Sequence, residues 1–376
     1  MVKLDLSKNW TIHAAAQTDG SAAKEPALEL AKYCGLLREQ AGLKQGQPQV
    51  TEAASNSLSA PIILLKAAGG NPDRNGFSWQ FKNERIEIFG DSVRGLWNGV
   101  FDFLAALGIK WPNPGQEGLP QAREDGASMV FPLKSDRAST PSLSSAQERK
   151  RLFIDGKTSA KERARIAKWA ARNKYDALVF SLSDKVLKGG DRSAEYVKLV
   201  KHYALIVEAG GCDFSLLLPR RLFLFHRDLF RMELGRRKSS PHFCPTNPQT
   251  TSRITEQTRY LFSRVMPQMT VPRVFHLLPD EGQENTWCAC PACRAFSPAE
   301  QNLIAVNSAA DALAGIDPDA QLSFFDLGME LDADEPQVDE PKVNKLQVNE
   351  PQVDEPQVRG ITPRKNMFRL FSPVAG

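Results

Sequence analysis

The sequence predicts an α/β protein, in which a small α+β N-terminal domain precedes a partial or atypical TIM-like (β/α) barrel. Residues 1–125 combine a helical spacing of apolar residues with strands that alternate in a period of two. From residue 149 onward, strand-like and helix-like segments alternate. The chain has 376 residues, of which 41% are hydrophobic and 24% charged, which suits two domains with apolar cores.

The N-terminal domain, residues 1–125, is predicted to mix strands and helices. Its predicted strands cover residues 10–14, 61–65, 77–81 and 85–89, and its predicted helices cover residues 27–40 and 92–107. The last two strands alternate apolar and polar residues, as a hairpin does. Asp91 or Ser92 can cap the second helix, and Gly108 can stop it.

The second domain, residues 149–330, follows a predicted linker at residues 126–148 that is rich in Ser, Pro and charged residues. Its predicted strands cover residues 152–154, 176–180, 213–218, 273–278 and 321–325, and its predicted helices cover residues 160–173, 193–209, 252–265 and 299–314. Strands that alternate with helices in this way form a parallel sheet with right-handed crossovers. The pattern fits an open and a closed barrel equally well.

A proline-rich repeat occupies residues 331–360, between the barrel-like domain and the C-terminal segment 361–376. Residues 334–358 read as five pentapeptides of the type DEPQV, and four of the five contain proline. Regularly spaced prolines forbid a helix, and the repeat has no apolar face to bury. We expect a disordered surface loop that returns to a strand-like segment near the C-terminus.

The charge pattern argues against nucleic acid as a partner, because the net charge is only +4 and basic residues are interleaved with acidic ones. A basic stretch at residues 231–238 can be a solvated loop or a contact for an anionic partner. No apolar run approaches the ~20 residues that cross a bilayer. The sequence also begins without a signal peptide, so we expect a cytoplasmic protein, or an exported one if an upstream leader is missing. No feature of the sequence identifies a protein partner.

Asp280 and Glu281 are the leading candidates for catalysis. They follow the apolar strand predicted at residues 273–278, and the carboxyl ends of barrel strands are where catalytic groups of such proteins lie. Glycoside cleavage requires a carboxylic acid that protonates the leaving oxygen. Such a pair can instead start a solvated loop or cap a helix.

Two stretches of the sequence are similar to known carbohydrate-active proteins. The strings RIEIFGDSVRGLWNGVFDFL (residues 85–104) and LGIKWPNPG (residues 107–115) resemble the small non-catalytic N-terminal domain of bacterial β-hexosaminidases and α-glucuronidases. Residues 243–293 resemble a large family of uncharacterised bacterial proteins that join this domain to a glycosidase-like barrel with a Cys-x-Cys-x-x-Cys motif. The resemblance implies a carbohydrate ligand, an amino-sugar or uronic-acid glycan.

The resemblance also implies roles for the acidic pair. The string HLLPDE, which begins at His276, is similar to the His-x-Gly-Gly-Asp-Glu motif of β-hexosaminidases. In that motif Glu281 would be the general acid, and Asp280 would orient the acetamido group of the substrate. Leu278 and Pro279 replace the two glycines of the motif. The protein is therefore either a glycoside hydrolase or an inactive barrel that serves as a carbohydrate-binding or protein-interaction module.

Three further side chains are candidates for substrate binding. Trp287 can stack on a sugar ring or anchor a loop, and Arg220 follows the strand predicted at residues 213–218, where it can line a cleft. His276 lies on the strand that precedes the acidic pair.

Cys288, Cys290 and Cys293 form the sharpest local motif. A Cys-x-x-Cys knuckle can place two thiolates on one metal ion, and the additional cysteine can supply a third. Zinc requires four ligands, so Cys244 or His242 would complete a structural site. The alternatives are reduced thiols that order a loop, or redox and disulfide chemistry. No other cofactor is predicted.

Overall fold

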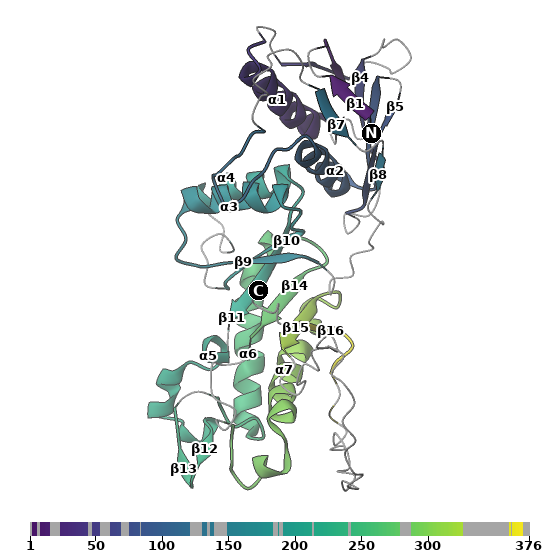
Figure 1. Ribbon diagram of the computed structural model, residues 1–376. Helices are drawn as coiled ribbons and strands as arrows, with labels where there is room; N and C mark the ends of the chain where they lie inside the picture. Colours follow the sequence, from purple (N-terminus) through teal and green to yellow (C-terminus); the bar gives the residue numbers. More distant parts are fainter. Residues whose placement is uncertain are drawn as a thin grey trace, which may run out of the picture. The chain divides into compact units, whose positions relative to one another are not determined.

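The computed structural model divides the chain into two compact units (Figure 1). Unit 1 comprises Met1–Ala209 and Gln268–Thr270, and unit 2 comprises Gly210–Pro267 and Val271–Gly376. The structure describes residues 2–5, 8–15, 23–43, 47–52, 61–68, 75–82, 84–120, 130–133, 136–138, 149–182, 187, 191–212, 214–239, 242–278, 287–325, 361 and 363–370. None of the described helices combines the length and the apolar character that crossing a membrane requires.

The first part of unit 1 is a mixed sheet with the strand order β3-β2-β4-β6-β5-β8. The strands are β2 (Thr11–Ala14), β3 (Gln49–Thr51), β4 (Ile62–Ala67), β5 (Phe77–Lys82), β6 (Arg85–Gly90) and β8 (Asp136–Ala138). The strands β2, β3, β4 and β6 run parallel, whereas β5 pairs antiparallel with β6 and with β8. The predicted hairpin is thus confirmed. A separate antiparallel pair joins β1 (Val2–Asp5) to β7 (Val130–Leu133).

The helices α1 (Lys24–Gln40) and α2 (Val93–Ala106) pack with this sheet. The Ser92 hydroxyl caps α2 by accepting a hydrogen bond from the backbone N–H of Gly95, at 3.0 Å. Gly108, at φ +96°, follows the helix in the left-handed region that glycine tolerates. The helix carries Trp97, Phe101 and Phe103, which are among the largest fully buried side chains of the described residues. Residues 92–107 therefore form the predicted helix and the centre of the core.

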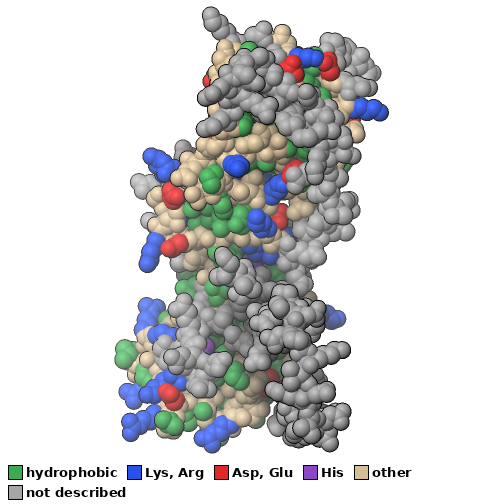
Figure 2. Space-filling view, viewed as in Figure 1, with side chains coloured by type: hydrophobic (Ala, Val, Ile, Leu, Met, Phe, Trp, Pro, Cys, Tyr) green, Lys and Arg blue, Asp and Glu red, His purple; other side chains and the backbone are tan. Residues whose placement is uncertain are grey.

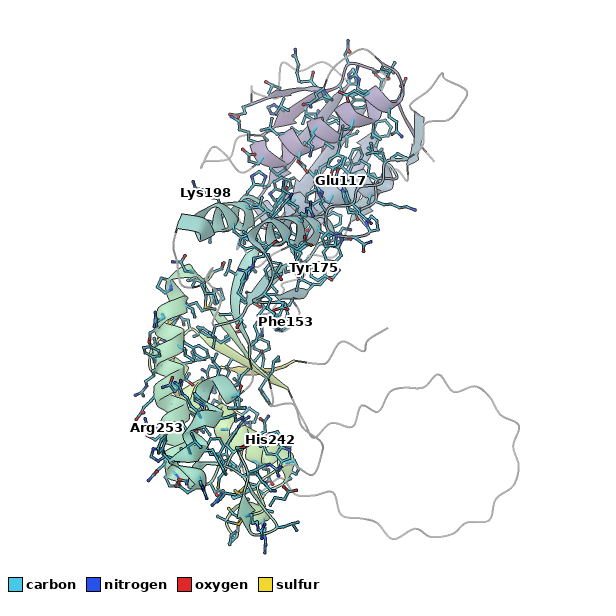
Figure 3. The ribbon with its side chains drawn as sticks, turned by 90° about the vertical axis from the view of Figure 1, so that its left-hand side faces the viewer. Glu117, Phe153, Tyr175, Lys198, His242 and Arg253 are labelled. Atoms are coloured by element: carbon cyan, nitrogen blue, oxygen red, sulfur yellow. The ribbon has the colours of Figure 1, made fainter. Side chains whose placement is uncertain are left out.

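The second part of unit 1 begins the parallel sheet. Its strands β9 (Arg151–Ile154), β10 (Ala177–Phe180) and β11 (Ile206–Cys212) pair in parallel, with β10 in the middle. Two helices, α3 (Ala160–Arg172) and α4 (Asp191–His202), connect them. Tyr175, labelled in Figure 3, follows α3 and precedes β10 in the chain. Its ring packs against that of Trp169 of α3, with ring centroids 5.4 Å apart.

Unit 2 contains the end of β11 and the parallel strands β14 (Val274–Leu277), β15 (Gln321–Phe325) and β16 (Met367–Leu370). The long helices α6 (Pro248–Val265) and α7 (Pro298–Ala314) lie side by side. Phe262 of α6 stacks on Phe275 of β14, with ring centroids 4.2 Å apart. Shorter elements fill the remainder: α5 (Phe214–Leu217), η2 (Arg220–Leu224), η3 (Arg227–Leu229), β12 (Met232–Glu233), β13 (Arg236–Arg237), η4 (Met266–Gln268) and η5 (Cys293–Ala295).

Two predicted elements of the second domain are wrong. The helix predicted at residues 193–209 ends at His202, and residues 206–212 are instead the strand β11. Ala204 adopts a left-handed conformation, φ 50°, which ends the helical path, and the apolar run that follows suits a helix and a buried strand equally well. As a consequence, the third strand predicted at residues 213–218 is wrong, because Phe214–Leu217 form the short helix α5.

Part of the predicted linker is also structured, because β7 and β8 lie within residues 126–148 and pair with strands of unit 1. The rest of that range, the repeat at residues 331–360 and the pair Asp280–Glu281 lie outside the described residues. On the face shown in Figure 2, basic side chains lie over both units with acidic side chains among them.

Candidate functional site

The strand β14 carries the best candidate for a substrate site. It runs parallel to β15, with Val274 opposite Gln321 and Leu277 opposite Phe324. The carboxyl ends of parallel strands meet at one edge of a sheet, where ligands of α/β proteins bind. Asp280 and Glu281 follow the end of β14 by three and four residues, and they lie outside the described residues.

His276 lies in the middle of β14 and is 1% exposed. Its ring Nδ1 is 2.6 Å from the hydroxyl oxygen of Ser323 on the neighbouring strand β15. The backbone of His276 also contacts Gly210, where an added Cβ would lie 2.1 Å from the His276 carbonyl oxygen. This close packing fixes the strand that leads to the acidic pair. A role of His276 in binding substrate stays a prediction.

The structure brings together Trp287 and Arg220, two of the predicted substrate-binding residues, around His242. The rings of His242 and Trp287 stack at a centroid distance of 4.1 Å and an interplanar angle of 13°. The Arg220 guanidinium donates a hydrogen bond to the His242 carbonyl, at 3.4 Å. Figure 3 labels His242 in the loop before α6. One face of the Trp287 indole is therefore covered by an imidazole, and a role of Trp287 and Arg220 in binding a sugar stays a prediction.

The charge state of His242 follows from its surroundings. Burial, together with the positive charges of Arg220 and Arg231, lowers the pKa of His242 to about 4. The imidazole is therefore neutral near pH 7. Its stacking on Trp287 is a contact between uncharged rings.

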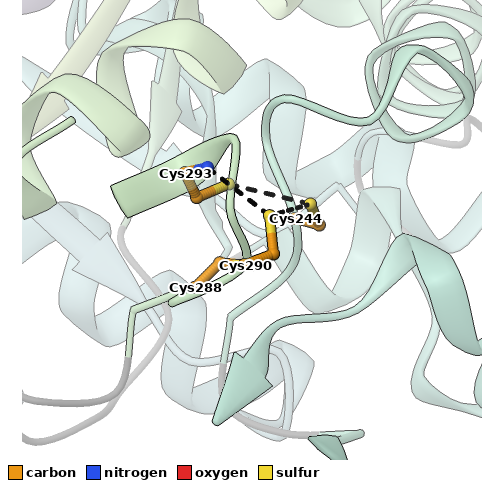
Figure 4. Close-up of side chains that lie close together, drawn as sticks. All are labelled: Cys244, Cys288, Cys290 and Cys293. Carbon is orange, nitrogen blue, oxygen red and sulfur yellow. Dashed lines mark hydrogen bonds between the residues drawn. The ribbon is translucent and has the colours of Figure 1, made fainter. Parts of the chain in front are cut away.

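Four cysteines converge in unit 2, at the centre of the second candidate site (Figure 4). The ligand atoms of Cys244, Cys288, Cys290 and Cys293 all lie within 4.8 Å of one another. The sulfur of Cys244 is 3.7 Å from that of Cys290 and 3.7 Å from that of Cys293. All four side chains are buried. Of the two predicted fourth members, the structure selects Cys244, because the His242 ring stacks on Trp287 instead.

Two loops position these cysteines. The backbone N–H of Cys244 donates to the carbonyl of Leu229, at 2.9 Å, next to an isolated antiparallel bridge between Phe230 and Phe243. The other three cysteines precede α7, whose Gln301 side chain contacts the backbone of Cys288 and Cys293. It accepts from the Cys288 N–H at 3.1 Å and donates to the Cys288 and Cys293 carbonyls at 3.2 Å each. Gln301 was not predicted from the sequence.

Backbone N–H groups donate hydrogen bonds to the cysteine sulfurs. The Met232 N–H donates to the Cys288 sulfur at 3.3 Å, and the Cys293 N–H donates to the Cys290 sulfur at 3.4 Å. Hydrogen bonds from the thiols of Cys288 and Cys293 lower the pKa of Cys244, whereas the same contacts raise the pKa of both donors. The thiolate is the form of cysteine that binds metal. The four sulfurs can hold a metal ion.

Comparisons with known proteins support the fold. The chain is similar to the crystal structure of a chitobiase from Flavobacterium johnsoniae, with 18% identity over 86% of this chain and 50% of that one, at a TM-score of 0.52. It is also similar to an exo-β-N-acetylglucosaminidase from Vibrio harveyi, with 12% identity over 86% of this chain and 55% of that one, at a TM-score of 0.49. A third similar structure is a β-N-acetylhexosaminidase from Bacteroides fragilis, with 15% identity over 86% of this chain and 63% of that one, at 0.46.

The likeness to the chitobiase shows that the chain has a hexosaminidase-like α/β fold, as the sequence predicts. The chain spans about half the length of that protein. No family model matches the sequence, and no curated protein matches it.

Proposed function

We propose that the chain is a glycoside-hydrolase-like protein that acts on or binds a glycan containing an amino sugar or a uronic acid. The position of β14 carries this proposal. The strand is paired in parallel within a hexosaminidase-like fold, and two carboxylates follow its end by three and four residues. That edge of a parallel sheet is the usual location of a ligand.

In the proposed reaction the two carboxylates have different roles. On an amino-sugar substrate, Glu281 protonates the leaving oxygen as the glycosidic bond breaks. The substrate's own acetamido oxygen, oriented by Asp280, forms the new bond to the anomeric carbon, which water then hydrolyses. His276 fixes the strand, through its contact with Ser323, rather than reacting itself. Trp287 and Arg220 offer an aromatic edge and a cation to a sugar ring.

A second candidate function is a catalytically inactive barrel that binds carbohydrate or a protein. Leu278 and Pro279 favour it, because they stand where hexosaminidases have two glycines. These residues limit the backbone conformations between the strand and the acidic pair.

One experiment separates the two functions. The full chain is incubated with chromogenic N-acetylhexosaminides and glucuronides and, in parallel, applied to a glycan array. Turnover that Glu281→Gln abolishes supports the enzyme, and binding without turnover supports the module. If the chain neither binds nor cleaves any of these glycans, both sugar functions are contradicted.

We also propose that the four-cysteine cluster holds a metal ion in a structural role that is independent of glycan chemistry. The proximity and burial of the four sulfurs support this role. Metal analysis of protein purified without chelator tests it, and a metal-free folded protein would contradict it.

A further inference from the structure

Given the proposed metal-binding role of the cysteines, we infer that the ion is a single zinc(II), and that this zinc tetrathiolate joins the segment of unit 2 that contains Cys244 to the segment 287–293. Its ligands are the sulfurs of Cys244, Cys288, Cys290 and Cys293.

The sulfur separations fit one tetrahedral ion. Zinc–sulfur bonds are about 2.3 Å long, so two sulfurs of a regular tetrahedron lie about 3.8 Å apart. The Cys244 sulfur is 3.7 Å from the sulfurs of both Cys290 and Cys293, close to that value. Two of the six sulfur separations therefore already match a zinc site, and all six are within 4.8 Å.

Other cysteine chemistry does not fit the same spacing. A disulfide requires sulfurs about 2.05 Å apart, far less than 3.7 Å. A multinuclear iron–sulfur cluster needs room for several irons and sulfides between its thiolates. The ligand atoms here all lie within 4.8 Å of one another, which leaves room for one ion.

The site is closed, as structural zinc sites are. Four protein sulfurs fill a tetrahedral shell, whereas catalytic zinc keeps one position for water or substrate. The exposed fractions of the four cysteines are 0–5%, so solvent does not reach the ion. The zinc therefore contributes to folding and takes no part in the glycan reaction.

Groups around the sulfurs match a negatively charged centre. Four thiolates and one zinc(II) carry a net charge of −2, which N–H donors and a cation can stabilise. The N–H groups of Met232 and Cys293 point at sulfurs, and the Arg237 guanidinium lies 4.0 Å from the Cys288 sulfur. Arg237 also donates to the Phe230 carbonyl at 2.6 Å, which ties β13 to the chain before β12.

The local core shows what the ion would hold together. Among the described residues, the four cysteines form a buried cluster of their own, with Met232 packed against it. The loop with Cys244, the β12–β13 hairpin and the Cys-x-Cys-x-x-Cys segment meet at this cluster. An ion bound to all four sulfurs would link the loop with Cys244 to the Cys-x-Cys-x-x-Cys segment, so metal binding contributes to their folding free energy.

Metal analysis of the full chain and its variants tests the inference. We expect about one zinc per wild-type chain, and near none in Cys244→Ser or Cys290→Ser. His242→Gln and Cys34→Ser are the controls, since His242 is the rejected fourth ligand and Cys34 is a buried cysteine of unit 1. Both should retain their zinc.

The possible outcomes distinguish an error in the identity of the ion from an error in the set of ligands. A wild-type chain without metal would overturn the metal-binding role itself, whereas one iron per chain would overturn only the choice of zinc. Zinc retained by Cys244→Ser, or lost by His242→Gln, would overturn the ligand set. If the serine variants do not fold, cobalt(II) exchanged into the wild-type chain replaces them as the test. An absorption spectrum typical of cobalt(II) with four thiolate ligands supports the proposed set of four cysteines. A spectrum typical of fewer thiolates contradicts it.

Discussion

Individual residues hold the sheet at the point where the candidate site begins. Gly210, at φ +131° in β11, allows the backbone of β14 to approach closely at His276. No other residue type fits there, because a Cβ would lie 2.1 Å from the His276 carbonyl oxygen and 2.4 Å from its nitrogen. The glycine pair 210–211 lies within β11, and nothing in the local sequence indicates this contact.

We predict that Gly210→Ala destabilises the protein by about 2–5 kcal/mol, from backbone strain together with steric overlap. Chemical denaturation monitored by circular dichroism measures the change. Gly156→Ala is the matched control, since nothing lies within 4 Å of the Cβ it would add. Equal stability of the two variants would show that β11 and β14 do not approach as described.

Arg94 is a second residue with a large structural effect. Its buried guanidinium donates to the carbonyls of Tyr203, Ala171 and Tyr175, at 3.2, 3.1 and 2.7 Å. Burial lowers the pKa of Arg94 to about 10, so the group remains charged at neutral pH. It joins α2 to the chain around α3 and α4.

Arg94→Met is expected to lower the free energy of unfolding by about 2–4 kcal/mol, because buried carbonyls lose their charged donor. Arg253→Met serves as the comparison, because Arg253 is half exposed and pairs with Glu256 on its own helix. That change should cost less than about 1 kcal/mol. A loss for Arg94→Met no greater than for Arg253→Met would argue against these hydrogen bonds.

At the scale of elements, helix ends were easier to predict than the strand β11. The signals at Ser92 and Gly108 identified the ends of α2, and the start of α7 was predicted within one residue. The error at residues 193–209 arose because Lys201 and His202 are followed by the apolar run 203–207, which suits a helix and a buried strand equally well. Hydrogen bonds to neighbouring strands decide whether such a run forms a strand or a helix, and the local sequence does not encode those hydrogen bonds.

The start of α7 offers a test at this scale. Ser297 and Glu300 form a reciprocal capping box, with Glu300 accepting from the Ser297 N–H at 2.7 Å. Ser297→Ala should cost about 1 kcal/mol. Ser308→Ala, in the middle of the same helix, should change stability by less than about 0.5 kcal/mol. Thermal unfolding of both variants measures these changes in stability. If Ser297→Ala leaves the stability unchanged, the capping box does not stabilise the start of α7.

For the whole molecule, the sequence predicted the fold class and the grouping of three cysteines, whereas metal binding by them remains a prediction. Three of the four converging cysteines lie within six residues, so their motif is visible locally. The fourth, Cys244, is distant in sequence, and the choice between it and His242 needed the fold. The contacts of Gln301 and Arg237 with the cluster have no local signature, because they depend on how α7 and β13 pack. The roles of Asp280 and Glu281 remain predictions.

Sugar binding by the full chain tests the proposed function most directly. Calorimetric titration with N-acetylglucosamine and with glucuronic acid compares the wild-type chain with Asp280→Asn. We expect saturable binding of at least one sugar and affinity at least tenfold lower in the variant, because a charged hydrogen bond contributes about 1.5–3 kcal/mol. Absence of binding to both sugars, or equal affinity of the two chains, would contradict a carbohydrate site at the end of β14.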